Sequence, residues 1–173
     1  MDTLEETTPL DSMRGVWGGE AVDQLDHGLQ SAKHAVDDGA DDALVLASAL
    51  HDLGHSPWLG FAPDYPHDRA AREWLTPRFG ARAGWLAGAH VAAKRYLVAT
   101  EPAYAATLSG VSVVSLAHQG GAFVDPSFTD HEWWPDALRL RRYDDAAKTP
   151  GAPAVSIADV LAVAQRLALR AGR

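Results

Sequence analysis

The segment His51-Asp52-Leu53-Gly54-His55 places two imidazoles and a carboxylate close together in the chain. Neighbouring side chains on a helix project about 100° apart, so His51 and Asp52 can reach one metal ion, or the carboxylate can bridge two. A buried carboxylate is costly without a partner, and a divalent metal ion is a strong partner. The segment therefore indicates a metal site, although such a pair alone also fits a hydrogen-bonded pair or a helix cap.

Other histidines extend this candidate site. His27 could complete a His/His/Asp set if its helix packs against the segment, or it could be a core or surface residue. His67 opens a helix after Pro66, and His90 lies on an apolar stripe with Lys94 one turn further on. A bound anion would explain this lysine, whereas a lone histidine on such a stripe is also typical of a hydrogen-bonded core residue. The remaining histidines are expected to be exposed: His34, His118 and His131.

The elements that position these residues are predicted to be helices. The apolar stripe of Leu25, Leu29, Ala32 and Val36 predicts a helix over 21–38, and residues 43–50 are apolar on nearly every side, which indicates a central helix ending at His51. Glycines and prolines between 54 and 66 indicate a loop. Further helices are expected over about 67–78, 81–98, 102–109, 111–118, 127–133, 135–147 and 157–169, with Val111 to Val114 as a weak strand candidate. The predicted fold class is all-α.

Composition limits the classes of protein to consider. The 173 residues, 47% of them hydrophobic, show no internal repeat and suggest one domain over 1–173 with a polar arm over 1–15. The absence of cysteine excludes disulfides and thiolate ligands. A net charge of −8 disfavours nucleic acid and anionic membranes as partners. With no leader-like or membrane-spanning segment, a cytoplasmic location is expected, and nothing in the sequence indicates an oligomeric state.

The order of His27, His51-Asp52 and Asp144 matches the His…His-Asp…Asp pattern of the HD-domain superfamily. Over roughly residues 15–150 the chain resembles one branch, the mixed-valent di-iron oxygenases that cleave the carbon–phosphorus bond of organophosphonates and are related to myo-inositol oxygenase. This resemblance rests on Glu20, His27, the segment 51–55, His67, the segment 90–97, Ser112, Gln119-Gly120-Gly121 and the segment 141–148.

The resemblance implies a single HD-domain helical bundle with two iron ions, Fe(II) and Fe(III), and dioxygen as co-substrate. One iron would be held by His27, His51, Asp52 and Asp144, and the other by His67 and His90, with Asp52 bridging. Nitrogen and oxygen ligands without thiolate suit iron.

The resemblance also implies a pocket for a small anionic organophosphonate, a 1-hydroxyphosphonate that is converted to a carboxylic acid and phosphate. Its substrate-binding residues would be Glu20, His55, Lys94, Ser112, Gln119 and Arg141, with His55 and Lys94 as the catalytic ones. Cationic and neutral donors suit a doubly charged oxyanion. Where the family often has a tyrosine that caps an iron, this chain has Trp17, which leaves Glu20 to recognise a substrate amino group or to close the site.

Two other functions are compatible with the same residues. An HD phosphohydrolase would use its metals to lower the pKa of a bound water and would not need dioxygen. A non-catalytic module would keep the fold and bind a small anion. The charged run from Arg139 to Lys148 is also typical of a solvated amphipathic helix with internal ion pairs.

Overall fold

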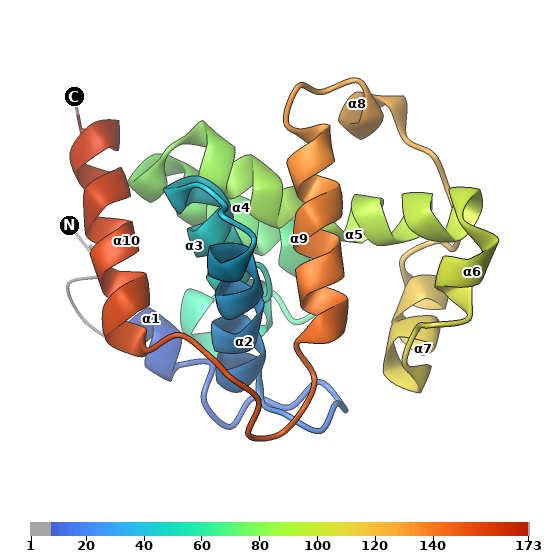
Figure 1. The fold of residues 1–173 in the computed structure, drawn as a ribbon, viewed down its shortest axis with the longest axis horizontal. Coiled ribbons are helices and arrows are strands. Elements are labelled where there is room, and N and C mark those ends of the chain that lie inside the picture. The colour runs from blue at the N-terminus through green and yellow to red at the C-terminus, as the bar shows by residue number, and fades with distance from the viewer. Residues whose placement is uncertain (1–7, 173) are drawn as a thin grey trace.

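The computed structural model describes residues 8–172, and all regular elements in this range are helical (Figure 1). They are α1 (Thr8–Asp11), α2 (Gln24–Asp37), α3 (Asp42–Leu50), the 3₁₀ turns η1 (Leu53–His55) and η2 (Pro57–Leu59), α4 (His67–Phe79), α5 (Ala81–Thr100), α6 (Pro102–Ala105), α7 (Gly110–His118), α8 (Pro126–Thr129), α9 (Trp134–Ala146) and α10 (Ile157–Ala171). The predicted all-α class is confirmed. Among residues 8–172, no helix is both long and apolar enough to cross a membrane.

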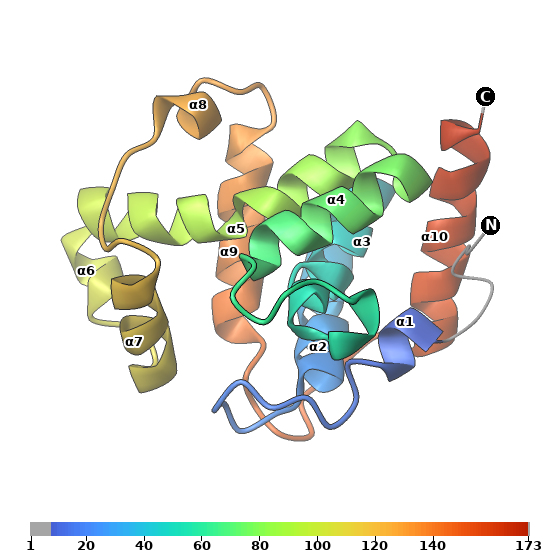
Figure 2. The same ribbon diagram turned by 180° about the vertical axis from the view of Figure 1, so that it is seen from behind.

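Helix α3 is the centre of the structure, as its sequence predicts. All of its residues from Ala43 to Leu50 are buried, and α2, α5, α9 and α10 pack around it. Asp41 caps its first turn by accepting a hydrogen bond from the Leu44 amide at 2.9 Å. Seen from both sides, α2 and α3 lie between α10 at one end and α6 and α7 at the other (Figures 1 and 2). The residues that follow α3 therefore begin in the core.

Helices α2 and α3 approach each other closely at Gly28. A Cβ atom built on Gly28 would lie 2.2 Å from the carbonyl oxygen of Ala49, so only glycine allows this approach. Gly28 follows His27, and Ala49 lies two residues before His51. The close packing at this point therefore fixes the two histidines relative to each other.

Some local expectations were wrong. The expected helix 111–118 is confirmed as α7, so the weak strand candidate at Val111–Val114 is helical; Ser109 caps this helix by accepting a hydrogen bond from the Ser112 amide. The expected helix 102–109 is shorter than predicted, because α6 covers only Pro102–Ala105. Likewise α8 covers only Pro126–Thr129 of the expected helix 127–133.

The expected polar arm over 1–15 also needs correction. Residues 1–7 lie outside the described part of the chain, but α1 and the turn after it bury Leu10 and Met13, each 1% exposed, in the core. Leu10 and Met13 do not belong to any of the apolar stripes from which the helices were predicted, so no periodic pattern indicated their burial. The N-terminal segment therefore contributes to the core from Leu10 onward.

The histidines outside the candidate site divide into two groups. His34 and His118 are exposed, as expected. His131 is half-buried, which corrects the expected exposure: its ring stacks on Trp85 with ring centroids 4.2 Å apart. The turn between α8 and α9 thus closes over α5 and removes His131 from full contact with solvent.

Candidate metal centre and adjoining cavity

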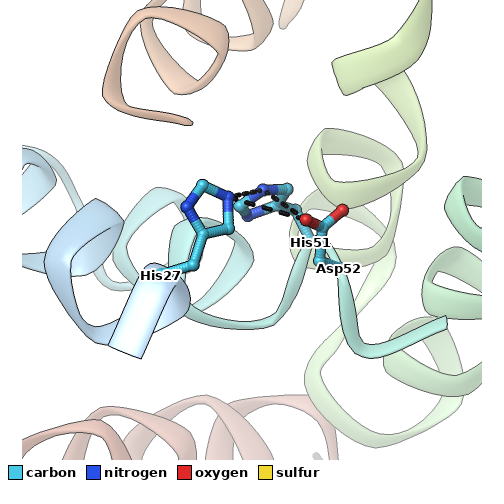
Figure 3. A group of neighbouring side chains, drawn as sticks. All are labelled: His27, His51 and Asp52. Atoms are coloured by element: carbon cyan, nitrogen blue, oxygen red, sulfur yellow. Dashed lines mark hydrogen bonds and ion pairs between the residues drawn. The ribbon is translucent and has the colours of Figure 1, made fainter. Parts of the chain in front are cut away.

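The end of α3 delivers the central His-Asp pair. His51 keeps a helical backbone and is fully buried, whereas Asp52 leaves the helix with φ −97° and ψ 8°. The chain then continues into η1, and the Asp52 side chain points away from α3 and toward the elements packed around it. Figure 3 shows the His27 imidazole from α2 pointing at His51 and Asp52.

Three of the histidines are held in one tautomer. The Nδ1 atoms of His27, His51 and His90 lie 2.8, 2.9 and 2.6 Å from the carbonyl oxygens of Ala147, Ser48 and Ala87. Because a carbonyl only accepts, each Nδ1 carries the proton and donates it. This fixes the ring orientation and directs each Nε2 toward the other histidines, which is how metal-binding histidines are usually held.

One group of ligands forms between α2, the end of α3 and α9. His27 Nε2 lies 3.1 Å from His51 Nε2, 3.5 Å from Asp52 Oδ2 and 3.2 Å from Asp144 Oδ1. His51 Nε2 lies 3.6 Å from Asp52 Oδ2 and 3.6 Å from Asp144 Oδ2. The residues expected to hold the first iron therefore converge on one point.

A second group lies on the other side of the same carboxylate. His67, the first residue of α4, and His90 of α5 have Nε2 atoms 3.0 Å apart. These atoms lie 3.5 and 3.4 Å from Asp52 Oδ1. Asp52 thus turns one oxygen to each histidine pair, which is the arrangement that a carboxylate bridging two metal ions requires.

The electrostatics of this cluster favour a cation. Burial opposes charge on His51, but the carboxylates of Asp52 and Asp144 raise its pKa to about 9. Against the opposing effect of burial, His51 and its neighbours hold the pKa of Asp52 well below its usual range. A largely buried site that attracts a proton this strongly also attracts a metal ion, which would take the proton's place at Nε2. The donor set of imidazoles and carboxylates suits a transition metal such as iron.

Gly54 is the point where η1 meets the start of α4. A Cβ atom there would lie 2.0 Å from the backbone oxygen of His67. We expect Gly54→Ala to push His67 away from Asp52, to lower the metal bound per chain after loading with ferrous iron, and to cost about 1–3 kcal/mol of unfolding free energy through overpacking. Metal analysis and urea unfolding measure the two effects. Gly110→Ala is the matched control because nothing lies within 4 Å of its added Cβ; equal behaviour of the two variants would contradict the prediction.

A cavity of about 190 Å³ opens beside the metal-binding groups. All six residues expected to bind substrate line it: Glu20, His55, Lys94, Ser112, Gln119 and Arg141. The volume fits a ligand smaller than a drug-sized molecule. Lys94 is 3% exposed, and its ammonium donates to Ser115 Oγ at 2.8 Å. Burial, followed by repulsion from Arg141, lowers the pKa of Lys94 to about 8, so it still carries a charge at neutral pH.

Two of these residues have additional contacts. Arg141 is 3% exposed and donates to Asp144 Oδ2 at 2.6 Å, to Asp145 and to the hydroxyl of Tyr104. The charged run of α9 is therefore only partly a solvated face, because Arg141 turns inward. His55 is 42% exposed, and its ring stacks on His67 with centroids 4.1 Å apart. It stands where the cavity meets solvent.

Sequence reasoning missed several cavity residues. Lys148, Gln24 and Ser115 also line the cavity. Gln24 lies three residues before His27 on α2, so helical spacing from that histidine could have indicated it. Trp17 is 63% exposed and is not among the residues that line the cavity.

Comparison with known proteins identifies three relatives that align with about three quarters of this chain. The chain is 35% identical over 144 residues, covering 76% of it, to the hydroxymethylphosphonate dioxygenase of Gimesia maris, of which 71% is covered. It is 35% identical over 139 residues (75% of this chain, 71% of the relative) to the glycine-betaine-forming [1-hydroxy-2-(trimethylamino)ethyl]phosphonate dioxygenase of Leisingera caerulea. It is also 33% identical over 141 residues (75% of this chain, 64% of the relative) to an uncharacterised mimivirus protein, L432.

No family model matches the chain. The family is instead shown by identity above a third over most of both chains to two proteins named as phosphonate dioxygenases. The helical fold and the His/Asp groups that could hold metal are consistent with that relationship. The chain therefore belongs to the HD-domain family of phosphonate dioxygenases.

Proposed function

We propose that this protein is a dioxygenase that uses two iron ions to cleave the carbon–phosphorus bond of a small 1-hydroxyphosphonate. The products are a carboxylic acid and phosphate. The observation that carries this proposal is the position of Asp52, with one oxygen toward His27 and His51 and the other toward His67 and His90. A site with one metal ion would not need this second pair of imidazoles, and dependence on dioxygen separates the proposal from a hydrolase that uses its metals.

The ligands would divide between the two ions according to the groups described above. His27, His51 and Asp144 would hold one iron, His67 and His90 would hold the other, and Asp52 would be shared. Iron, when bound, supplies the redox chemistry with dioxygen that amino-acid side chains cannot perform. The protein's contribution is to fix the imidazoles through their Nδ1 hydrogen bonds and to keep the cluster buried.

The cavity residues would bind the phosphonate dianion. Among residues 8–172, no carboxylate lies within ion-pair distance of the Lys94 ammonium, so its charge is available to a bound anion. Ser112 and Gln119 would add neutral donors in the same cavity, whereas the Ser115 hydroxyl already donates to the Ser112 carbonyl oxygen at 3.1 Å. Arg141 contributes charge from behind Asp144, and His55 would contact the substrate from the mouth. Lys94 and His55 are therefore the proposed catalytic residues of the chain.

The overall reaction balances for the simplest substrate. Hydroxymethylphosphonate and one molecule of dioxygen contain the same atoms as formate and phosphate in their acid forms. The carbon–phosphorus bond breaks, the carbon is oxidised from an alcohol to a carboxylic acid, and dioxygen is the only oxidant. Equal amounts of dioxygen consumed, formate formed and phosphate released are therefore expected.

The test loads the protein with ferrous iron under anaerobic conditions, adds hydroxymethylphosphonate and then admits air. We expect phosphate release to begin only on admission of air, at a one-to-one ratio to dioxygen consumed. Phosphate release without dioxygen, or with manganese or magnesium in place of iron, would overturn the proposal and favour the hydrolase. A coupled ferrous–ferric signal in the electron paramagnetic resonance spectrum of partly reduced protein would identify the metal pair independently of turnover.

A further inference from the structure

Two buried glutamines on α2 differ in how their amides are bonded. Gln30 is 3% exposed; its Nε2 donates to the Thr149 carbonyl at 2.7 Å, and the Thr149 amide donates back to its Oε1 at 3.4 Å. Gln24 is 8% exposed, but its buried amide oxygen has no hydrogen-bond partner within residues 8–172. A buried oxygen without a donor lowers the stability of the folded state. The fold alone therefore gives no reason for a glutamine at position 24.

Gln24 lines the cavity beside the metal-binding groups. It lies one helical turn before His27, so the two side chains project from the same face of α2. A Cβ atom built on Gly18 would lie 2.9 Å from Gln24 Nε2, so glycine at this position gives the amide room. The last bond of a glutamine side chain rotates over a broad range, and the amide oxygen can thus turn toward a donor in the cavity.

The carboxylates of the cavity already have partners. Glu20 Oε1 accepts a hydrogen bond from Ser109 Oγ at 2.6 Å and lies 3.2 Å from the Lys148 ammonium. The Asp52 and Asp144 carboxylates face the metal-binding histidines. A ligand that brings a hydrogen-bond donor as well as a negative charge therefore needs another acceptor, and a neutral amide oxygen supplies one without repelling the charge.

Gln119 also lines the cavity and also has a buried amide oxygen with no partner in the described part of the chain. It ends α7, the helix whose two cavity serines accept hydrogen bonds from the Lys148 and Lys94 ammonium groups at 3.0 and 2.8 Å. Gln119 thus belongs to the wall whose cations suit the phosphonate. Gln24 extends from α2 together with a metal-binding histidine, so the two amides serve different parts of the cavity.

We propose that Gln24 is a further substrate-binding residue whose amide oxygen accepts a hydrogen bond from the hydroxyl group of the 1-hydroxyphosphonate. This inference rests on the proposed function and refines it. The proposed reaction oxidises the carbon that carries the hydroxyl, so this hydroxyl has to come beside the metal-binding groups, whereas the phosphonate goes to the cations. The hydroxyl is also the only donor of hydroxymethylphosphonate once its phosphonate is fully ionised. Gln24 is the unpaired acceptor on that side of the cavity.

The first measurement compares ligands with and without the hydroxyl. The affinities of the iron-loaded protein for hydroxymethylphosphonate and methylphosphonate are measured by anaerobic titration calorimetry. Gln24→Met keeps the approximate size of the side chain but removes the acceptor. It should weaken binding of hydroxymethylphosphonate by about fivefold or more and leave that of methylphosphonate within about twofold. Contacts of the hydroxyl with other groups are common to both proteins and cancel in this comparison. Gln119→Met should weaken both compounds alike.

The second measurement separates a binding role from a structural one. Because Gln24→Met removes a buried oxygen that has no partner, it should raise the Tm of the iron-loaded, substrate-free protein by about 2 °C or more. Gln30→Met is the matched comparison on the same helix, since the Gln30 amide bonds Thr149. It should lower the Tm by about 2 °C or more and leave the ratio of the two affinities unchanged.

The outcomes separate this inference from the proposed function. Equal weakening of both compounds in Gln24→Met, or a fall in its Tm like that of Gln30→Met, would overturn the role of Gln24 and leave the dioxygenase proposal intact. A loss confined to hydroxymethylphosphonate in Gln119→Met instead of Gln24→Met would also overturn it. The expected loss in Gln24→Met without turnover of any phosphonate would support the inference and contradict the dioxygenase proposal. A failure of both compounds to bind the unaltered protein would overturn both.

Discussion

Asp52→Asn is expected to abolish oxidative turnover and to leave at most one iron per chain. The variant keeps the shape of the side chain but replaces one oxygen with an amide nitrogen, which cannot act as a ligand. The amide nitrogen then faces one of the two histidine pairs, either His27 with His51 or His67 with His90. That pair loses the carboxylate oxygen that lies 3.4–3.6 Å from its Nε2 atoms. Mutation of residues that only hydrogen-bond to metal ligands costs about 10–100-fold in metal affinity or activity. Loss of a shared ligand should therefore cost about 10³-fold or more in kcat.

The measurement pairs iron content with dioxygen-dependent phosphate release. Asp26→Asn is the control, because Asp26 is exposed on α2 next to His27 and is not among the residues that line the cavity. We expect this control to bind iron and turn over like the original protein. If Asp52→Asn retained two irons and most of its activity, Asp52 would not bridge the metal ions.

The helices and the central His-Asp pair could be predicted because their signals are local. The all-apolar segment 43–50 indicated a buried helix, and the structure places His51 at its buried end. His27 could be related to that segment only through the expected packing of two helices. The order of histidines and aspartates in a related family was the further evidence that these residues form one site. Asp144 depended on the resemblance, because the run around it is equally typical of a solvated helix.

Contacts between distant residues could not be predicted from spacing. The Glu20–Lys148 pair joins the segment before α2 to the segment after α9, and no local pattern relates the two. The stacking of His131 on Trp85 likewise depends on a turn folding back over α5. The burial of Leu10 in a helix of one turn carries too little periodicity to be recognised. These features arise from tertiary packing rather than from local sequence preference.

The second large expected effect is on stability, and it follows from the buried position of Arg141. Its guanidinium is 4% exposed and pairs with Asp144, itself 6% exposed, and with Asp145. Arg141→Met fills a similar volume but leaves these carboxylates without their cation. Removing one partner of a buried ion pair costs about 3–5 kcal/mol of unfolding free energy. Burial resists its charge, but Asp144 and Asp145 raise the pKa of Arg141, which agrees with a strong interaction.

Arg142→Met is the matched control, one residue further along α9. The Arg142 side chain is 54% exposed and pairs with Glu101 at 3.0 Å, where solvent weakens the interaction to about 1 kcal/mol or less. Urea unfolding is compared at one iron concentration and again with a chelator present, because bound metal stabilises the folded state by mass action. If the loss in Arg141→Met vanished with the chelator, Arg141 would act only through metal affinity, and the ion pair would contribute nothing to the fold itself. If the loss of unfolding free energy persists in both conditions, Arg141 both orients Asp144 and holds α9 in place. The metal centre and the helical core then depend on the same residue.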